Sequence, residues 1–243
     1  MSLPINLFCL PFAGGNKYSY REFVDKAPAF LNIITLEYPG RGTRMKDSLV
    51  SDINDLVEDV YLQIIPHIKE NKYVIYGHSL GGLMTYLLTK KLIENNYQQP
   101  VQLFVTGTTG PSAISRTEKK RHLLEKIEFF EEIRLLNGMP EEILANEELL
   151  EYFEPILRSD FKASENYMHV NDAPFNIPLT VITGTEEEMQ IEDIKLWQKV
   201  TIQPVEFNEM SGNHFFIYDH VTKIIEMICK KLYIYKTAIR YEY

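Results

Sequence analysis

Short runs of apolar residues alternate with longer segments of helical period along most of the chain. In a parallel sheet that is buried on both faces, the strands are nearly continuous apolar runs, and amphipathic helices connect them. The pattern therefore predicts an α/β fold with a mostly parallel sheet flanked by helices. The predicted strands are Ile5–Leu10, Asn32–Glu37, Tyr73–Tyr76, Val101–Thr106, Leu179–Thr183 and Pro204–Asn208.

One connecting segment, from Ser51 to Ile68, has a clear helical pattern. Apolar residues recur there at steps of three and four, and acidic residues occupy the opposite face. The hydroxyl of Ser51 is suited to accept a hydrogen bond from the first turn, so Ser51 is the predicted N-cap. The apolar positions are Ile53, Leu56, Val57, Val60, Ile64, Ile65 and Ile68.

The alternation stops at residues 112–170, which contain short segments of helical period and no convincing strand. Leu136-Asn137-Gly138 is typical of a helix end, and Met139-Pro140-Glu141-Glu142 of a helix start, while Asn146 is suited to cap the next helix. Long insertions between strands often carry function. We therefore predict a helical lid over an active site; the alternative is that these helices cover one face of the sheet.

Composition limits the classes of protein to which the chain can belong. With 243 residues, 45% hydrophobic and 24% charged, it is expected to form one globular domain, and we find no linker or internal repeat. The formal net charge of -9 argues against a nucleic-acid partner, because phosphate backbones attract basic surfaces. No apolar run approaches the about 20 residues that span a membrane, and no secretory signal is evident at the N-terminus.

The two cysteines, Cys9 and Cys229, both lie in apolar segments. We expect buried free thiols in a reducing cytoplasm rather than a disulfide. No Cys/His cluster has the spacing of a zinc site, and neither a P-loop nor a dinucleotide-binding fingerprint occurs. The sequence therefore predicts a cytoplasmic protein that uses no metal or other cofactor and that has no nucleic-acid or membrane partner.

The strongest chemical signal is Gly77-His78-Ser79-Leu80-Gly81, which fits the G-x-S-x-G pattern. It follows an apolar strand and opens an apolar helix, the context in which this pattern forms the nucleophile elbow of α/β-hydrolases. The two glycines keep side chains away from the strained turn on which the serine sits. Ser79 is therefore the predicted nucleophile. His78, at the variable position of the pattern, is expected to be structural.

A serine hydroxyl needs a base within hydrogen-bonding reach, and in this fold the acid and the histidine follow the serine in the chain. Only His214 and His220 lie beyond the last predicted strand. His214 is part of a turn-forming stretch directly after that strand, where a loop can present an imidazole at the edge of the sheet. His220 begins an apolar helix. The sequence therefore favours His214 as the base.

The oxyanion of an acyl-transfer reaction needs two backbone N–H donors. One is expected from Leu80, the residue after the nucleophile. The second is expected from the glycine-containing loop after the first strand, where Ala13 is the candidate. The neighbouring residues Phe12, Gly14 and Phe215 are expected to contact the substrate.

Five motifs together resemble the type II thioesterases, the editing enzymes of nonribosomal peptide and polyketide synthases. The similarity runs from about Leu3 to about Leu232. It implies an α/β-hydrolase core 1–232 with the lid at 112–170, a C-terminal tail 233–243, and a role in antibiotic-type biosynthesis. The implied reaction is hydrolysis of stalled or aberrant acyl groups from the 4'-phosphopantetheine arm of a carrier protein. The motifs are Leu10-Pro-Phe-Ala-Gly-Gly15, Glu37-Tyr-Pro-Gly-Arg-Gly42, Gly77-His-Ser-Leu-Gly-Gly82, Leu157-Arg-Ser-Asp-Phe161 and Gly212-Asn-His-Phe-Phe216.

The chain departs from this family at the catalytic acid. The family usually carries aspartate three residues after the glycine that ends the strand before the last one, and here that position is Glu187. Glutamate takes this role in some hydrolases of the fold. The alternatives are that Glu186 or Glu188 reaches the histidine, or that the three glutamates form a solvated loop. The resemblance also implies that Asp160 ties the lid to the core through a hydrogen bond.

Several alternatives stay open at this stage. The same residues suit a medium-chain acyl-carrier-protein thioesterase that releases fatty acids, a carboxylesterase for small esters, or a binding module without activity. A basic stretch at the start of the lid is either a docking surface for the carrier or an ordinary solvated helix face. The tyrosine-rich tail could add an edge strand, pack on a neighbour or be disordered. The basic stretch comprises Arg116, Lys119, Lys120, Arg121 and Lys126.

Overall fold

The structure, a computed structural model, describes residues 4–68, 72–139 and 141–240. Its centre is a six-stranded sheet in the order β2-β1-β3-β4-β5-β6, and every neighbouring pair is parallel. The predicted α/β fold is confirmed, with one strand at each predicted position. The strands are β1 Ile5–Leu10, β2 Leu31–Thr35, β3 Tyr73–His78, β4 Gln102–Thr106, β5 Leu179–Gly184 and β6 Glu206–Met210.

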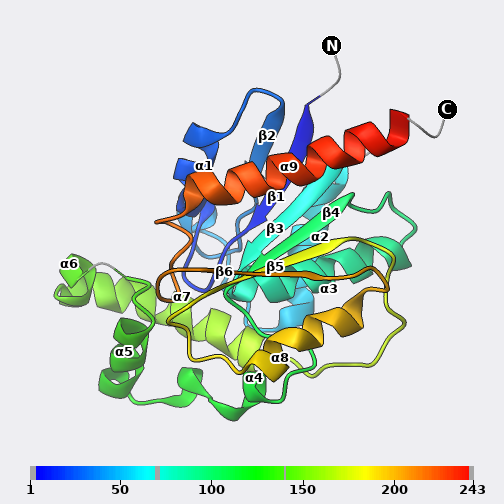
Figure 1. Ribbon diagram of the computed structural model, residues 1–243. Helices are drawn as coiled ribbons and strands as arrows, with labels where there is room; N and C mark the ends of the chain where they lie inside the picture. Colours follow the sequence, from blue (N-terminus) through cyan, green and yellow to red (C-terminus); the bar gives the residue numbers. More distant parts are fainter. Residues whose placement is uncertain (1–3, 69–71, 140, 241–243) are drawn as a thin grey trace.

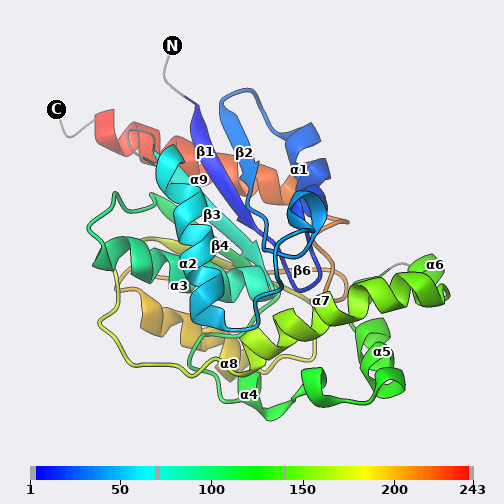
Figure 2. The ribbon, with the colours of Figure 1, turned by 180° about the vertical axis from the view of Figure 1, so that it is seen from behind.

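Two layers of helices cover the faces of the sheet (Figures 1 and 2): α1 and α9 lie on one face, and α2 and α3 on the other. Because successive strand residues point to opposite faces, each central strand contributes to both cores. In β3, for example, Ile75 packs with the α2–α3 side and Tyr76 with the α9 side. The helices are α1 Arg21–Lys26, α2 Ile53–Ile64, α3 Leu80–Glu94, α8 Ile191–Lys195 and α9 Val221–Arg240, with 3₁₀ helices at Lys17–Tyr20, Gly42–Arg44, Ile65–His67, Arg121–Leu123 and Leu196–Val200.

Several predicted element ends differ from the structure. The N-cap of α2 is Asp52, whose carboxylate accepts hydrogen bonds from the N–H groups of Asn54 and Asp55, and not Ser51, which lies one residue outside the helix. Aspartate and serine are equally good caps, so the pattern could not separate two adjacent candidates. Strand β6 begins at Glu206 and not at Pro204, which has no N–H to donate to the sheet.

The predicted lid is a set of helices at the end of the sheet toward which the strands run (Figure 1). Within the described part of residues 112–170 no strand occurs. The lid has a small core of its own, formed by Phe129, Phe130, Ile133, Leu144 and Leu157. The lid helices are α4 Ser115–Glu118, α5 Lys126–Leu135, α6 Glu141–Leu144 and α7 Glu147–Glu165.

The predicted caps of the lid helices are partly correct. Asn146 caps α7 by accepting a hydrogen bond from the N–H of Leu149. Helix α5 ends at Leu135, and the residue with positive φ after it is Asn137 and not Gly138. The predicted start at Pro140 lies outside the described residues.

A buried ion pair fastens α7 to the body of the protein. The guanidinium of Arg41, in the loop after β2, holds both carboxylate oxygens of Asp160, with 2.8 Å between Nη2 and Oδ1. Both side chains are at most 2% exposed. Burial lowers the pKa of Arg41, but the charge and hydrogen bonds of Asp160 more than offset this, so that the pKa is raised. Asp160 therefore ties the lid to the core as predicted, through a partner that the sequence analysis missed.

The basic stretch of the lid is used largely for internal contacts. Lys119 and Arg121 both pair with the carboxylate of Glu132, and Lys120 donates to the backbone carbonyl of Glu165. Arg116 is partly buried and donates to the hydroxyl of Thr108 and the carbonyl of Thr109. Two of the five basic side chains therefore pair with acids and two more donate to uncharged groups within the protein, so the structure lends no support to the docking hypothesis.

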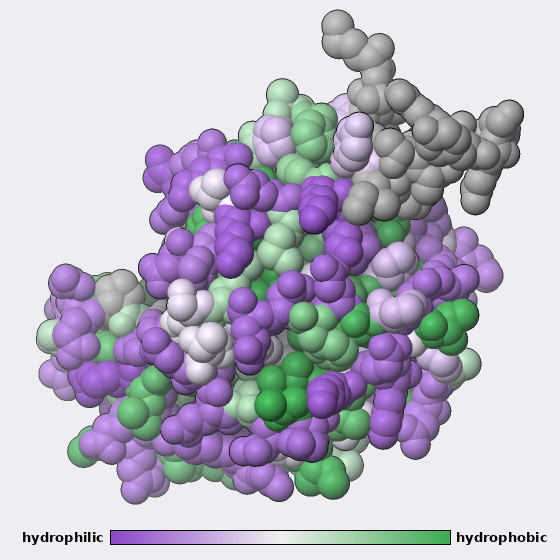
Figure 3. Space-filling model, in the orientation of Figure 1, coloured by the Kyte–Doolittle hydropathy of each residue, from purple (hydrophilic) through white to green (hydrophobic). Residues whose placement is uncertain are grey.

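The C-terminal helix α9 continues across position 232 as far as Arg240, so the chain forms no edge strand up to that residue. Residues 241–243 lie outside the described residues. The face shown in Figure 3 is mostly hydrophilic, with hydrophobic residues scattered in small groups. None of the helices in the described ranges is long and apolar enough to cross a membrane.

The buried ion pair makes a prediction about stability. Asp160→Asn removes the negative charge and leaves the Arg41 guanidinium buried without it, so the free energy of unfolding should fall by about 3 kcal/mol. Denaturant unfolding at neutral pH measures this change. The control is Asp47→Asn, which removes a largely exposed partner of Arg44 and should cost less than about 1 kcal/mol. Equal losses in the two variants would show that the pair adds no more than a surface contact.

Candidate active site

Ser79 occupies a strained turn between the end of β3 and the start of α3. Its φ of 55° and ψ of -116° lie in a region that costs a residue with a side chain about 1–3 kcal/mol. The N–H of Ser79 donates to the carbonyl of Thr106 at 2.9 Å, which fixes the turn to the neighbouring strand. The predicted elbow is thus present as a local geometry that projects the serine beyond the edge of the sheet.

Two glycines permit this turn by allowing close backbone contacts. A Cβ at Gly77 would overlap the carbonyl oxygen of Gly81, and a Cβ at Gly81 would overlap that of Leu10. The sequence analysis expected such side chains to collide with the nucleophile. In the structure a side chain at Gly77 would instead collide with the backbone of the first turn of α3, and one at Gly81 with the backbone at the end of β1.

His214 and Glu187 lie together at the same edge of the sheet. Glu187 follows β5 and His214 follows β6, and the Nδ1 atom of His214 is 2.5 Å from Oε1 of Glu187. Two backbone hydrogen bonds join the loops, from the N–H of Thr185 to the carbonyl of Met210 and from that of Glu186 to Gly212. The sheet therefore sets the spacing of this pair.

The extra methylene of the glutamate is accommodated by a side chain that folds back on its own turn. The second oxygen, Oε2 of Glu187, accepts a hydrogen bond of 2.7 Å from the N–H of Gly184. The Glu187 side chain is only 4% exposed, whereas Glu186 and Glu188 are exposed. Of the three glutamates, Glu187 is the one whose carboxylate contacts His214.

A cavity of about 230 Å³ brings the predicted residues to one surface. Ser79 and His214 both line it, as do Phe12, Ala13 and Gly14. Leu80 is buried behind the cavity, but as the first residue of α3 it has a backbone N–H without a partner inside the helix. The lid supplies the opposite wall through Ile133, Leu136, Gly138, Met139, Ile143, Phe153, Leu157 and Phe161.

The loop after β1 is held by the lid. The N–H of Gly14 donates to Oδ2 of Asp160 at 2.8 Å, and that of Gly15 donates to the carbonyl of Phe12 at 2.9 Å. Gly14 has a φ of +78°, and a Cβ there would lie 2.6 Å from Leu157 of α7. Among the described hydrogen bonds the N–H of Ala13 has no partner, so it is free to bind a group in the cavity.

Aromatic residues form the wall of the cavity next to His214. Phe215 packs edge-on against Phe12, with ring centroids 4.9 Å apart, and stacks on Tyr218. A Cβ at Gly138 of the lid would overlap the ring of Phe215. The sequence analysis missed Tyr218, which belongs to no motif, and interpreted Gly138 only as part of a helix end. His220 lies elsewhere and contacts the carbonyl of Ser211 through Nε2.

His78 is buried directly beside His214. Their ring centroids are 4.8 Å apart, and Nδ1 of His78 is 3.0 Å from the hydroxyl oxygen of Thr106. Burial and the neighbouring His214 lower the pKa of His78 well below its ordinary value. The imidazole of His78 is therefore neutral over the physiological pH range.

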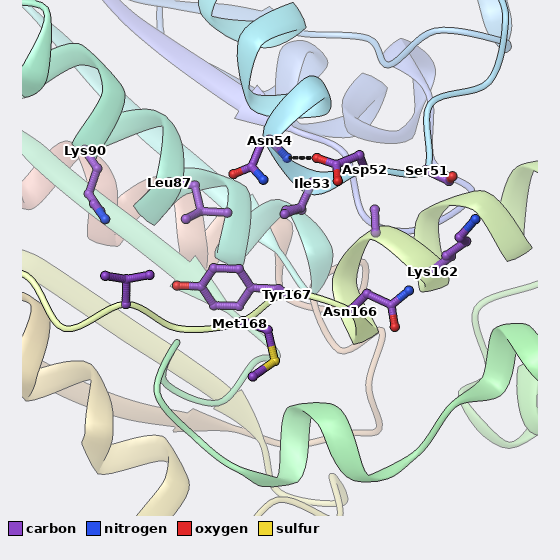
Figure 4. Close-up of a pocket in the computed structure, with 12 residues that line it drawn as sticks. Ser51, Asp52, Ile53, Asn54, Leu87, Lys90, Lys162, Asn166, Tyr167 and Met168 are labelled. Carbon is purple, nitrogen blue, oxygen red and sulfur yellow. Dashed lines mark hydrogen bonds between the residues drawn. The ribbon is translucent and has the colours of Figure 1, made fainter.

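A second hollow, of about 490 Å³, lies between the start of α2, α3 and the end of α7 (Figure 4). It is larger than the cavity at Ser79, but none of the predicted site residues lines it. At its rim Lys90 pairs with Asp172, and Asp52 is occupied in capping α2. Size alone therefore does not identify the active site, whereas the converging side chains do.

The site contains the groups that acyl transfer requires: a serine on a strained turn, a histidine paired with a carboxylate, and free N–H groups. Within the described ranges no three His, Cys, Asp or Glu side chains gather as a metal ion would need. Cys9 and Cys229 are both free thiols, the first buried and the second partly so.

Known proteins of the same kind match the chain over nearly its whole length. The Thioesterase domain family matches residues 5–232. The gramicidin S biosynthesis protein GrsT of Aneurinibacillus migulanus is 31% identical over 229 residues, which cover 94% of this chain and 89% of that protein.

Solved structures agree with this match. ClbQ from the colibactin NRPS/PKS pathway superimposes with a TM-score of 0.91 at 28% identity, covering 97% of this chain and 99% of that one. The type II thioesterase BorB from the borrelidin biosynthetic cluster gives a TM-score of 0.86 at 25% identity, with 96% and 94% covered.

The buried imidazole of His78 makes a prediction about pH. In the unfolded chain a histidine takes up a proton near pH 6.5, whereas the folded state keeps His78 neutral. The unfolded state then binds more protons, so stability is lost as the pH falls below about 6.5. When the pH is lowered from about 7.5 to 5.5, the free energy of unfolding should fall by roughly 1 kcal/mol more in the wild type than in His78→Phe, which has no imidazole to protonate at this position. Denaturation at both pH values measures the difference, and parallel curves would contradict the prediction.

Proposed function

The chain belongs to the thioesterase family and is a thioester hydrolase, and from this premise we propose that its substrates are acyl groups on carrier proteins. These groups would be attached to the 4'-phosphopantetheine arm during nonribosomal peptide or polyketide synthesis, and hydrolysis would remove stalled or aberrant ones. The observation that carries the proposal is the convergence of Ser79, His214 and Glu187 at one edge of the sheet, where Ser79 and His214 line a cavity whose opposite wall is the lid.

We assign the first chemical step to Ser79 and His214. Because Nδ1 of His214 is bonded to Glu187, Nε2 is the nitrogen that remains to take the proton of the serine hydroxyl. The Ser79 oxygen attacks the thioester carbonyl, and a tetrahedral oxyanion forms. Glu187 holds the imidazole in the required tautomer and stabilises the imidazolium that appears in the transition state.

The oxyanion is assigned to the backbone N–H groups of Ala13 and Leu80. One donor lies in the loop after β1, and the other lies directly after Ser79 at the N-terminus of α3, where the helix dipole also favours negative charge. Collapse of the intermediate expels the pantetheine sulfur as a thiolate, which takes the proton from the His214 imidazolium and leaves as the thiol. Water, activated by the same histidine, then frees the acid and restores Ser79.

The cavity suits an apolar acyl group better than a charged group. Apart from Asn16 and Ser19, the side chains that line the cavity with Ser79 and His214 are aromatic or aliphatic, with Phe12 and Phe215 on the side of the core and the lid opposite. An apolar acyl chain would lose its contact with water there, which favours binding. A carrier protein is the partner, and a cytoplasmic location is consistent with the free thiols Cys9 and Cys229.

Carrier-bound substrate tests the proposal directly. Acyl groups loaded on a phosphopantetheinylated carrier protein should be hydrolysed with a higher kcat/KM than nitrophenyl esters of the same acids. Ser79→Ala should lower hydrolysis on the order of a million-fold while leaving the fold intact. Mass spectrometry of the carrier and circular dichroism of the variant measure the two effects.

The outcomes separate the alternatives. Faster cleavage of soluble nitrophenyl esters would favour a carboxylesterase, and a strong preference for medium-chain acyl carriers would favour a fatty-acid-releasing enzyme. Near-normal activity in a folded Ser79→Ala protein would remove Ser79 from the mechanism.

Glu187→Gln should lower kcat by roughly 10³ to 10⁴, because the amide supplies no negative charge and favours the wrong imidazole tautomer. Glu187→Asp should lie between this variant and the wild type, since the charge stays but the reach is shorter. The matched controls are Glu186→Gln and Glu188→Gln, whose side chains are exposed, and these should be nearly silent. Steady-state kinetics on an acyl-pantetheine measures all four, and a larger loss at either control would move the acid to that neighbour.

A further inference from the structure

His78 is a buried titratable residue that the proposed mechanism does not use. It is completely buried and does not line the cavity, so it cannot contact the substrate. Its ring nevertheless lies 4.8 Å from that of His214, at an interplanar angle of 42°. Of the side chains in the proposed mechanism, His214 is the one whose ring packs against His78.

The surroundings of His78 fix its ring tightly. Phe12, Phe215 and Phe216 pack around it, with centroids 5.3 to 6.1 Å away. A Cβ at Gly107 would overlap Cε1 of His78 and lie 3.3 Å from Oε1 of Glu187, so the absence of a side chain at Gly107 leaves room for both groups. His78 is therefore packed against His214 and lies close to Glu187.

The hydroxyl of Thr106 sets the rotation of the ring. Its oxygen is 3.0 Å from Nδ1 of His78 and 3.1 Å from the hydroxyl of Tyr76. Nε2 of His78 has no hydrogen-bond partner in the described part of the chain. The ring of His78 is therefore fixed at Nδ1 by a hydrogen bond, and its other side is available for packing against His214.

His214 itself is held by few contacts. Its loop is partly exposed, and the one hydrogen bond that its ring makes among the described residues is to Glu187. Together with the Cβ–Cγ bond this hydrogen bond restrains the ring at one edge, but it makes no contact with the faces of the ring. Packing on a second, rigid ring adds a further restraint.

We propose that His78 is a positioning residue for His214: its buried, neutral imidazole, fixed by Thr106, is the platform that keeps the His214 ring turned toward Ser79. The proposal rests on the proposed roles of Ser79 and His214. Neutrality is part of it, because a positive charge here would oppose the imidazolium that His214 becomes. The charged or titratable groups that face His78 are His214 itself and Glu187; its other neighbours are Thr106 and the three phenylalanines.

The experiment compares two replacements of His78 in acyl-pantetheine hydrolysis. His78→Phe keeps a flat ring but loses the Thr106 bond, and His78→Asn keeps a hydrogen-bonding group at the Nδ1 position but loses the rest of the ring. Misplaced catalytic groups cost up to about 10²-fold. We expect kcat to fall about 3-fold to 10-fold in the first variant and about 10-fold to 100-fold in the second, with KM within about 2-fold because the cavity is unchanged.

The pH profile separates positioning from simple packing. The acid limb of kcat/KM reports the base of the free enzyme. In His78→Asn the shorter polar side chain admits water next to His214, which stabilises its imidazolium, so the limb should move to higher pH. In His78→Phe it should stay in place. A loss of thermal stability without these kinetic changes would overturn the proposal.

Thr106 provides a test that does not change His78. Thr106→Val should lower kcat a few-fold in the wild type and have no further effect in His78→Phe, because it acts through the lost bond. The matched control is Tyr76→Phe, which removes the other hydrogen bond of the same hydroxyl and should leave kcat unchanged. Additive effects of Thr106→Val and His78→Phe would contradict the proposal, and so would an equal loss in Tyr76→Phe.

Failure of this inference is distinguishable from failure of the proposed function. If the wild-type protein shows no thioesterase activity that depends on Ser79, the proposed function fails. Each His78 variant is assayed about 20 °C below its own melting temperature, where it is folded. If the activity is present and both variants have the kcat and the pH profile of the wild type, only the role of His78 is rejected. If either His78 variant does not fold, Thr106→Val and its control decide the question.

Discussion

The carboxylate of Asp160 is the contact on which the geometry of the site depends. Its two oxygens receive the guanidinium of Arg41 and the N–H of Gly14, so one buried group joins the lid, the loop after β2 and the loop after β1. Burying two charges is costly and is offset only when each lone pair finds a donor. Here two donors from Arg41 and one from Gly14 bind the carboxylate of Asp160, which brings together three segments distant in sequence. Their mutual position is therefore set, and the free N–H of Ala13 is set with it.

The strained backbone of Ser79 is the second constraint on the site, and it requires close contacts between the turn and the elements around it. A serine at φ 55° persists only where the surroundings leave it no alternative. Here the hydrogen bond to Thr106 fixes its N–H, and the close approach of Gly77 to Gly81 fixes the start of α3. Ser79, the proposed nucleophile, therefore projects from rigid elements of the core, while the lid that faces it supplies the opposite wall of the cavity.

The sequence predicted the features that are encoded locally and missed those that depend on distant partners. Six strands, the elbow at Ser79 and the position of His214 follow from periodicity, glycines and chain order. The pairing of Arg41 with Asp160 links residues far apart in the chain, and nothing in either motif indicates the other. The basic stretch looked like a docking surface for the same reason, because the carboxylate of Glu132, which neutralises Lys119, comes from the next helix. The composition of the tail favoured no single structure, so the sequence did not predict that α9 continues to Arg240.

The environment of His214 shows how one imidazole is given two kinds of restraint. On one side Glu187 supplies a negative charge, held in place because its second oxygen is bonded to Gly184. On the other side His78 supplies a neutral ring that burial keeps unprotonated. The charge favours the imidazolium electrostatically, while the ring restricts its orientation without adding a competing charge. A glutamate that folds back onto its own turn and a buried histidine at the variable position of the elbow thus restrain His214 from two sides, as its proposed role in proton transfer from Ser79 requires.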